Sequence, residues 1–246
     1  MKYLIFSDVH SNLEAFKAVM TFIKNRKFEQ FIFLGDIVGY GANPNEVIEE
    51  MKKISPLFIV RGNHDKAVAG LTNLDYFNPV AATAVIWTSK NLRPENLGFL
   101  KGLSSGPLKI NEEITICHGS PWDEDYYMFN KFDALEAFSF FDTKMCFFGH
   151  THFPAIHILE NGDVKTIYPT KFPFRAKIES GFRYLINPGS IGQPRDGNPL
   201  SSFLIYDSKK ESITIHRISY DISTAQSKIL EAGLPQMLAS RLSSGI

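Results

Sequence analysis

Cysteines and long apolar runs are scarce in this 246-residue sequence. The two cysteines, Cys117 and Cys146, sit in apolar runs, so free buried thiols in a reducing compartment are expected rather than a disulfide scaffold. No apolar run is long enough to cross a bilayer. The first run meets an acid at Asp8, too early for the core of a signal peptide. These absences predict a cytoplasmic protein with no membrane partner.

An excess of charge of either sign is also lacking, because 26 Lys and Arg balance 26 Asp and Glu. Proteins that follow a phosphate backbone usually carry a basic face, so the balance gives no support to nucleic acid as a partner. Net charge hides local clusters, and a basic patch on one face is compatible with it. The 44% hydrophobic fraction is ordinary for a globular protein, and the 21 phenylalanines are compatible with a homo-oligomer interface.

The beginning of the chain alternates short apolar runs with amphipathic stretches. Buried strands are predicted at 3–6, 31–34 and 57–60, and helices are predicted to begin at a Ser11–Glu14 capping box and at Pro44. This order predicts a mostly parallel sheet covered by helices. Helical spacing predicts that residues from about 79 to 103 are helical.

The second half has a different pattern. Strands at 114–117 and 145–148 lead into short strands that are separated by turn residues such as Asn161-Gly162, which is typical of antiparallel hairpins. These are predicted at 156–159, 164–168, 184–186, 203–206 and 213–218, and helices at 222–230 and 234–242. No repeat or linker divides the chain, so we expect two packed sheets in a single domain that spans residues 1–246.

Polar residues of one kind follow five of the predicted strands. The segments are Ser7–His10, Gly35-Asp36, Gly62–Asp65, His118-Gly119 and Gly149–His152. Residues beyond the carboxyl ends of strands converge on one crevice in an α/β sheet. One Asp or His at such a position is more often a cap or turn residue, but five segments of the same chemistry predict a metal site. His157 and His216 lie outside these segments and are predicted to pack within later strands.

The residue types suit divalent first-row metals such as manganese, iron, nickel or zinc. The spacings Asp8-x-His10 and His150-x-His152 each put two side chains on the same side of an extended segment. The carboxylate of Asp36 has two oxygens and can bridge two ions. The amide oxygen of Asn63 would add a ligand without adding charge.

The motifs SDVH, GDIVGYG, RGNHD, CHGSP and GHTH, in this order, resemble the five-motif signature of the calcineurin-like metallophosphoesterases. The stretch GDIVGYG with the later NPGSIGQPRDG also resembles a bacterial and archaeal subgroup of small phosphodiesterases. The signature spans Asp8 to His152. It implies an α/β fold, a four-layered α/β/β/α sandwich of two mixed sheets flanked by helices, with two divalent metal ions at the edge of the sheets.

By match to the motifs, the resemblance implies two ligand sets that share Asp36. One metal would be held by Asp8, His10, Asp36 and His152, and the other by Asp36, Asn63, His118 and His150. A hydroxide that bridges the ions would attack phosphorus in line with the leaving oxygen. His64 would be the general acid, and Asp65 would hold its tautomer and raise its pKa.

Two further residues are candidates for substrate contact. Arg195 could pair with phosphate oxygens, and the alternative is a salt bridge with Asp196 or another acid. Asn12 is the next polar residue after the first motif, and the alternative is a role at the start of a helix. The aromatic stretches 126–129 and 172–174 either line a specificity pocket or pack in the core or at a subunit contact.

These residues favour a phosphodiesterase that acts on a small phosphoester. The related protein phosphatases usually read GDxVDRG, where this chain has Gly39-Tyr40-Gly41, so an arginine that helps to clamp a phosphate dianion is missing. A phosphomonoesterase or a dinucleoside polyphosphate hydrolase is the alternative. A non-enzymatic binding scaffold is less favoured, because such relatives tend to lose the histidine of GNH and His64 is present.

Overall fold

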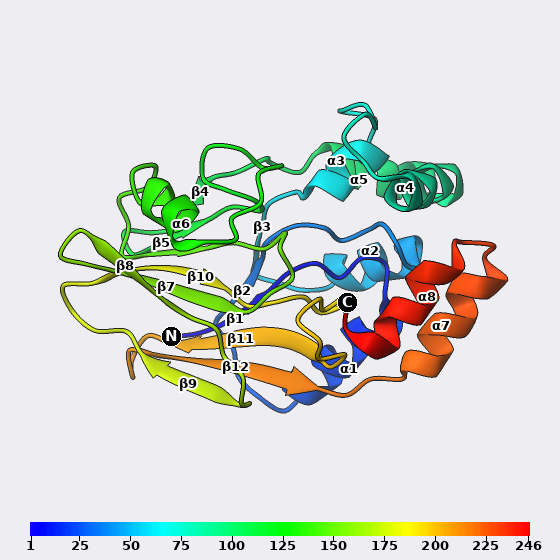
Figure 1. Cartoon of the computed structure of the whole chain (residues 1–246). Helices are drawn as coiled ribbons and strands as arrows, with labels where there is room; N and C mark the ends of the chain where they lie inside the picture. Colours follow the sequence, from blue (N-terminus) through cyan, green and yellow to red (C-terminus); the bar gives the residue numbers. More distant parts are fainter.

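Two mixed six-stranded sheets form the centre of the structure, a computed structural model that describes residues 1–246 (Figure 1). Sheet A has the order β3 (Leu57–Ile59), β2 (Gln30–Phe33), β1 (Lys2–Phe6), β11 (Ser201–Asp207), β12 (Ser212–Ile218) and β9 (Phe174–Lys177). Sheet B has the order β4 (Leu108–Lys109), β5 (Ile114–Ile116), β6 (Met145–Phe147), β10 (Arg183–Asn187), β7 (Ala155–Glu160) and β8 (Asp163–Ile167). Each sheet combines parallel and antiparallel pairs.

The alternation of side chains along β1 shows how the layers form. Tyr3 and Ile5 belong to the apolar cluster between the two sheets, whereas Leu4 and Phe6 belong to the cluster under the helices of sheet A. Successive side chains of a strand point to opposite faces, so a continuous apolar run serves a sheet that is covered on both sides.

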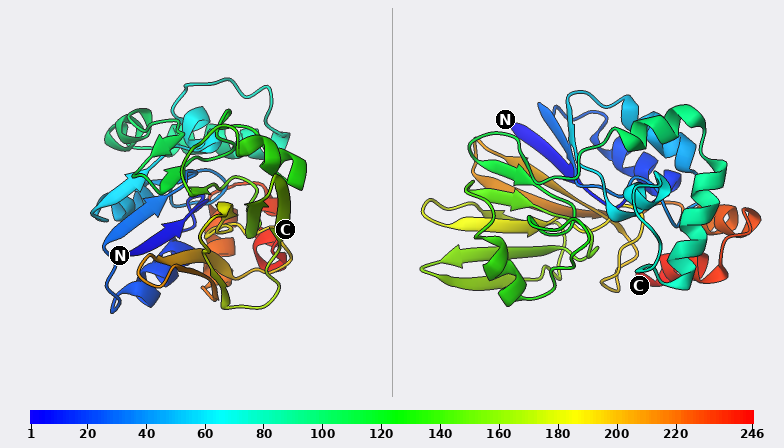
Figure 2. Two further views of the ribbon diagram at one scale, coloured as in Figure 1. Left: turned by 90° about the vertical axis from the view of Figure 1, so that its left-hand side faces the viewer. Right: turned by 90° about the horizontal axis from the view of Figure 1, so that it is seen from above.

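Helices cover the outer faces of both sheets. Their bounds are α1 (Leu13–Ile23), α2 (Pro44–Lys52), α3 (Asn63–Val68), α4 (Pro79–Asn91), α5 (Pro94–Lys101), α6 (Lys131–Ala137), α7 (Ile222–Glu231) and α8 (Gln236–Ser244). Apolar residues of α1, α2 and α5 pack on sheet A, and α6 contacts β7 and β8 of sheet B. Helices α4, α7 and α8 share a cluster beyond one end of the strands (Figure 2). This arrangement confirms the predicted two mixed sheets flanked by helices.

Several local predictions need correction. The cap of α1 is Asn12, whose side chain accepts the N–H of Ala15, and not Ser11. The helical stretch predicted over 79–103 is divided into two helices, because the residue that precedes a proline disfavours the helical conformation and Arg93 precedes Pro94. The short elements α3, α6, β4 and β9 were not predicted.

The two halves of the chain do not correspond to the two sheets. Strands β9, β11 and β12 extend the sheet that β1 begins, while β5 and β6 join the sheet of β7, β8 and β10. Cys117 and Cys146 are free and buried, as predicted. None of the helices combines the length and the apolar character that a bilayer crossing requires.

Candidate metal centre

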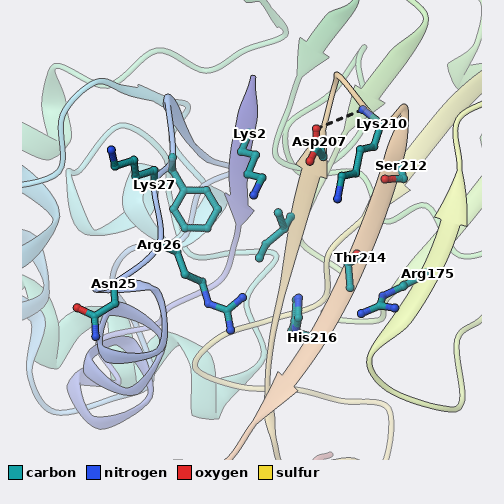
Figure 3. A pocket seen from close by; sticks show the side chains of 12 residues that line it. Lys2, Asn25, Arg26, Lys27, Arg175, Asp207, Lys210, Ser212, Thr214 and His216 are labelled. Carbon is teal, nitrogen blue, oxygen red and sulfur yellow. Dashed lines mark hydrogen bonds between the residues drawn. The ribbon is translucent and has the colours of Figure 1, made fainter.

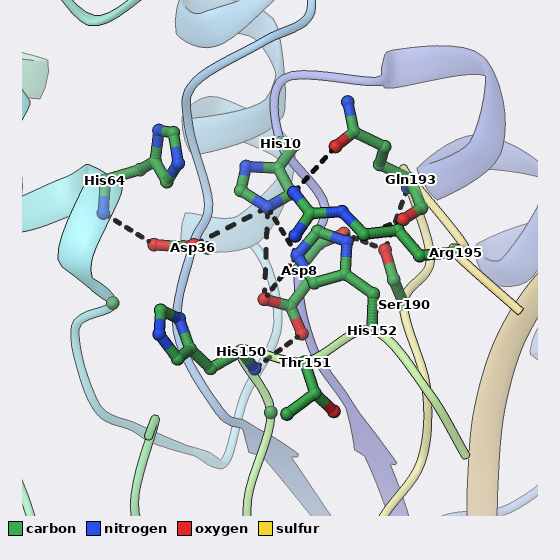
Figure 4. Close-up of polar contacts among 12 residues, drawn as sticks. Asp8, His10, Asp36, His64, His150, Thr151, His152, Ser190, Gln193 and Arg195 are labelled. Atoms are coloured by element: carbon green, nitrogen blue, oxygen red, sulfur yellow. Dashed lines mark hydrogen bonds and ion pairs between the residues drawn. The ribbon is translucent and has the colours of Figure 1, made fainter. Parts of the chain in front are cut away.

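The chain segments that follow β1, β2, β3, β5 and β6 meet at one edge of the two sheets. They carry the seven predicted metal ligands, namely Asp8, His10, Asp36, Asn63, His118, His150 and His152. Figure 4 shows Asp8, His10, Asp36, His64, His150 and His152 from four of these segments. The ligand atoms of Asp8, His10, Asp36 and His152 all lie within 4.8 Å of one another, and so do those of Asp36, His118 and His150. The structure therefore brings together the predicted residues as two groups that share Asp36.

The backbone is strained at this edge. Positive φ angles of 54°, 49°, 60°, 65° and 65° occur at Asp8, His10, Asp36, His150 and His152. A left-handed conformation costs an L-residue about 1–2 kcal/mol, and such strain clusters at functional sites. Backbone hydrogen bonds between the segments after β1 and β2 hold the turns, since the N–H of Asp8 donates to Gly35 O and that of His10 to Asp36 O, each at 3.0 Å.

Backbone carbonyls fix the tautomers of three histidines. The Nδ1 atoms of His10, His152 and His118 lie 3.1, 2.6 and 2.8 Å from the carbonyl oxygens of Val38, Gln193 and Leu34. A carbonyl only accepts, so each Nδ1 carries a proton and each Nε2 is directed into the site. Burial lowers the pKa of His10 and of His152, so their Nε2 atoms present lone pairs at neutral pH. Against burial, the charge of Asp36 raises the pKa of His118 to about 10 in the chain alone.

The ring nitrogens directed into the site face one another. The Nε2 atoms of His10 and His152 are 3.1 Å apart. His150 is reversed, because its Nε2 faces the carbonyl oxygen of Asp125 at 3.2 Å and its Nδ1 lies 3.1 Å from Nε2 of His118. Lone pairs that face one another in a buried site, such as those of His10 and His152, repel unless a cation lies between them.

The oxygen atoms fit the same interpretation. Oδ2 of Asp36 lies 3.5 Å from Nε2 of His10 and 3.4 Å from Nε2 of His118, between the two groups. Oδ1 of Asn63 lies 3.2 Å from Nε2 of His118. Oδ1 of Asp8 is buried and has no hydrogen-bond partner. A set of imidazole nitrogens together with carboxylate and amide oxygens suits divalent first-row metals.

His64 lies beside this centre without belonging to it. Its ring centroid is 4.4 Å from that of Tyr40, 4.9 Å from that of His10 and 5.1 Å from that of Phe77. Its Nδ1 is buried and has no hydrogen-bond partner. Burial lowers the pKa of His64 to about 4, against the attraction of Asp36, so the ring of the chain alone is neutral at neutral pH.

The prediction that Asp65 holds the ring of His64 and raises its pKa is wrong. Both oxygens of Asp65 accept backbone N–H groups, Oδ1 from Ile37 and Val38 and Oδ2 from Asp36 and Gly62, at 2.9–3.1 Å. Burial and the charge of Asp36 raise the pKa of Asp65 to about 7. Asp65 therefore organises the turn that carries Asp36.

The two substrate-contact candidates differ. Asn12 is buried, and both ends of its amide are used internally, by the N–H of Ala15 and by the carbonyl oxygen of Gly192. This corrects the prediction that Asn12 contacts substrate in favour of its role at the start of the helix. The pairing of Asp196 with Arg217 leaves the guanidinium of Arg195 without a carboxylate partner.

Arg195 is held beside the centre (Figure 4). One of its terminal nitrogens donates to Gln193 Oε1 at 3.0 Å and to the hydroxyl of Tyr40 at 3.3 Å, and its buried Nε has no partner. A cavity of about 470 Å³ adjoins the centre and is lined in part by Tyr40, Asn63, His64, Tyr127 and His150.

Sequence reasoning missed Tyr40 and the individual role of Tyr127. The ring of Tyr127 stacks on His150 with 3.6 Å between centroids. The predicted aromatic stretch 126–129 contains this residue, but no local pattern identifies the partner of a stacked ring. For Tyr40, the sequence indicates only that it stands where the related protein phosphatases have an arginine.

Comparisons with known proteins agree with this geometry. Residues 1–211 match a family model described as a calcineurin-like phosphoesterase superfamily domain. An uncharacterized protein of Methanocaldococcus jannaschii, MJ0912, is 41% identical over 98% of this chain and 97% of its own. The phosphodiesterase YfcE of Escherichia coli is 24% identical over 82% of this chain and 85% of its own. The crystal structure of a metallophosphoesterase from Sphaerobacter thermophilus is similar with a TM-score of 0.87 and 39% identity, over 100% of this chain and 99% of that one.

Proposed function

The chain belongs to the calcineurin-like phosphoesterase superfamily, and from that premise we propose that it is a phosphodiesterase that depends on two divalent metal ions. The observation that carries the proposal is the set of ring nitrogens that face one another around the carboxylate of Asp36. Two ions would be held by Asp8, His10, Asp36 and His152 and by Asp36, Asn63, His118 and His150. Manganese, iron, nickel and zinc suit these ligands.

The ions, when bound, would supply the Lewis acidity that activates water and stabilises charge on the phosphoryl oxygens. The chain's own contribution begins with charge. The carboxylates of Asp8 and Asp36 balance only half of the charge of two divalent cations, so the site stays net positive and attracts a phosphodiester monoanion.

The guanidinium of Arg195 would bind a phosphoryl oxygen through nitrogens that the protein leaves unpaired. Because Tyr40 and Gln193 already hold the Arg195 side chain by hydrogen bonds, this side chain loses less conformational entropy when it binds the substrate.

His64 would donate a proton to the leaving oxygen. A phosphate anion beside the ring raises its pKa, because an opposite charge favours the protonated form. The buried, unpartnered Nδ1 leaves the ring free to take up that proton in the bound state. General acid catalysis of this kind typically contributes about 10²–10⁴-fold.

Two observations support a diester over a monoester. Tyr40 occupies the place of an arginine that helps related phosphatases to bind a dianion, and the adjoining cavity has no lysine or arginine in its lining. The relationship to the phosphodiesterase YfcE points the same way. A small phosphodiester in the cavity beside Asn63 and His64 is therefore the substrate class that we propose.

A substrate panel on metal-loaded protein tests the proposal. It compares bis-p-nitrophenyl phosphate with p-nitrophenyl phosphate, cyclic nucleotides and dinucleoside polyphosphates, with Asp36→Asn as the control that disrupts both ligand groups. Diester turnover at least tenfold above monoester turnover, lost in Asp36→Asn, is expected. Faster monoester or polyphosphate turnover would establish the alternative enzyme classes, and no turnover at full metal occupancy would favour a binding scaffold.

A further inference from the structure

Figure 3 shows the side chains that line a second large cavity, of about 700 Å³. Lys2, at the beginning of β1, is in its lining, whereas Asp8 lies beyond the other end of the same strand. Six residues of extended chain span about 20 Å. Strands β1, β11, β12 and β9 and the segment 25–28 after α1 contribute to this cavity, which we call the basic groove. A ligand bound there is separate from the catalytic chemistry.

Five cationic side chains surround the basic groove, and none of them pairs with a carboxylate within 4.0 Å. They are Lys2, Arg26, Lys27, Arg175 and Lys210. Lysines elsewhere on the surface, such as Lys53, Lys66 and Lys109, do form ion pairs. The groove is therefore a local excess of positive charge in a chain whose net charge is zero.

One carboxylate, that of Asp207, lies in the lining, and it is already used. Its Oδ1 accepts the backbone N–H groups of Lys209 and Lys210 at 3.1 and 3.2 Å. A single acid that is bound to the turn does not balance five cations. A concave surface of one sign also concentrates its field, which attracts ions of the opposite sign.

The floor of the groove supplies neutral polar groups. Ser212, Thr214 and His216 alternate along β12 and so point to the same side. Burial, together with the positive charges of Arg26 and Arg175, lowers the pKa of His216 to about 4. The imidazole is therefore neutral at neutral pH, and it and the two hydroxyls can donate hydrogen bonds to an anion.

We propose that the basic groove binds a soluble small molecule that carries several phosphate groups. Four separate chain segments supply five cations, which is more than a ligand with a single carboxylate would need. Guanidinium and ammonium groups are the side chains that bind phosphate. The volume lies within the range of small-molecule sites. The cations also line a hollow of limited extent, whereas a nucleic-acid surface is typically a patch or stripe that follows the backbone. This site does not depend on the function proposed for the metal centre.

Calorimetric titration with inorganic tripolyphosphate tests the groove directly. The full-length chain carries Asp36→Asn and is titrated in chelator, so that chelation and the metal centre contribute nothing. We expect one site per chain, and affinity at least tenfold weaker when Arg26→Ala and Arg175→Ala are added. Lys90→Ala with Lys101→Ala is the matched control, because both lysines are exposed, make no ion pair and change the net charge equally.

Arg26 stacks on Phe22 at 4.3 Å, so its loss could alter the fold, and a second pair, Lys27→Ala with Lys210→Ala, avoids this contact. Unfolding midpoints accompany each titration. Equal affinity in either folded groove variant would overturn the proposal, as would an equal loss in the Lys90 and Lys101 control. A single-stranded oligonucleotide that binds the groove more tightly than tripolyphosphate would replace it with a nucleic-acid surface.

Discussion

Nε2 of His10 lies 3.1 Å from Nε2 of His152, and both rings direct their N–H to backbone carbonyls on the far side. Two residues 142 positions apart thus present lone pairs to each other in a buried site. Folding this arrangement costs free energy that a cation between the rings would recover. The next two predictions, which concern metal content, follow from this pair of residues.

Removal of metal should lower the stability of the folded chain. An ion that binds only the folded state stabilises it by about 2.7 kcal/mol per site at 100 times its Kd. Thermal unfolding with and without chelator, with metal analysis by mass spectrometry, should show two ions per chain and a lower midpoint after chelation. An unchanged midpoint with no bound metal would contradict the metal centre.

Asp36→Asn should reduce the occupancy of both metal positions, because its Oδ2 lies between the two groups. The asparagine retains an oxygen for the N–H of His64, so the fold should persist. Asp8→Asn is the comparison and should reduce mainly one position, since Asp8 belongs to one group. The measurement is the metal content per chain of each variant. Equal losses of metal in the two variants would argue against an Asp36 that both positions share.

His64→Ala should keep both ions and lower turnover by about 10²–10⁴-fold with a substrate whose leaving group is a poor one. The loss should be much smaller with p-nitrophenolate, which needs little protonation as it leaves. Turnover of a series of diesters with leaving groups of rising pKa measures this difference. The same loss across the series would assign His64 a structural or binding role instead.

Gly39→Ala should also reduce turnover. Gly39 has a φ of +98°, and a Cβ there would lie 2.6 Å from Nδ1 of His64. Gly70→Ala is the matched control, because Gly70 has a φ of +72° and nothing within 4 Å of such a Cβ. Both variants should lose about 1 kcal/mol of stability or more from the strained backbone. Only Gly39→Ala should then slow turnover while keeping its metals, and equal rates in the two variants would contradict this packing role.

Asp65→Asn should lower stability and metal binding, and it should leave unchanged how turnover depends on the leaving group of the substrate. The amide nitrogen would face backbone N–H groups that the carboxylate now accepts, leaving buried donors unpaired at about 1–3 kcal/mol each. Asp75→Asn, at an exposed position, makes the same chemical change as a control. Denaturant unfolding measures the difference, and equal stability of the two variants would show that the turn does not need Asp65.

Stability should fall as the pH decreases from about 6.5 to 4, in part through His157. Burial lowers its pKa to about 4 in the folded state. Between that value and the ordinary pKa of about 6.5, the unfolded chain binds more protons, which favours unfolding by at most about 3 kcal/mol at the acid end. His157→Gln should flatten the slope of unfolding free energy against pH in this window. An unchanged slope would mean that the ring takes up its proton without unfolding.

The sequence by itself determined the succession of the first strands and helices along the chain and the identity of the residues that gather at the metal centre. Apolar runs mark buried strands, and the polar residues that follow them must lie at the carboxyl edge of the sheet, so local pattern sufficed for Asp8 through His152. It did not place the strands in their sheets, because pairing such as that of β1 with β11 depends on packing across the whole chain.

Only the tertiary structure decided which atoms each group uses. Ring tautomers depend on carbonyls such as Val38 O and Gln193 O, which look alike in any sequence. The role of Asp65 differs from the prediction because its carboxylate accepts backbone N–H groups from a turn that is distant in the sequence, and not the ring of His64. The basic groove likewise exists only where four separate segments meet, since charges scattered along a neutral chain create a field when folding brings them together.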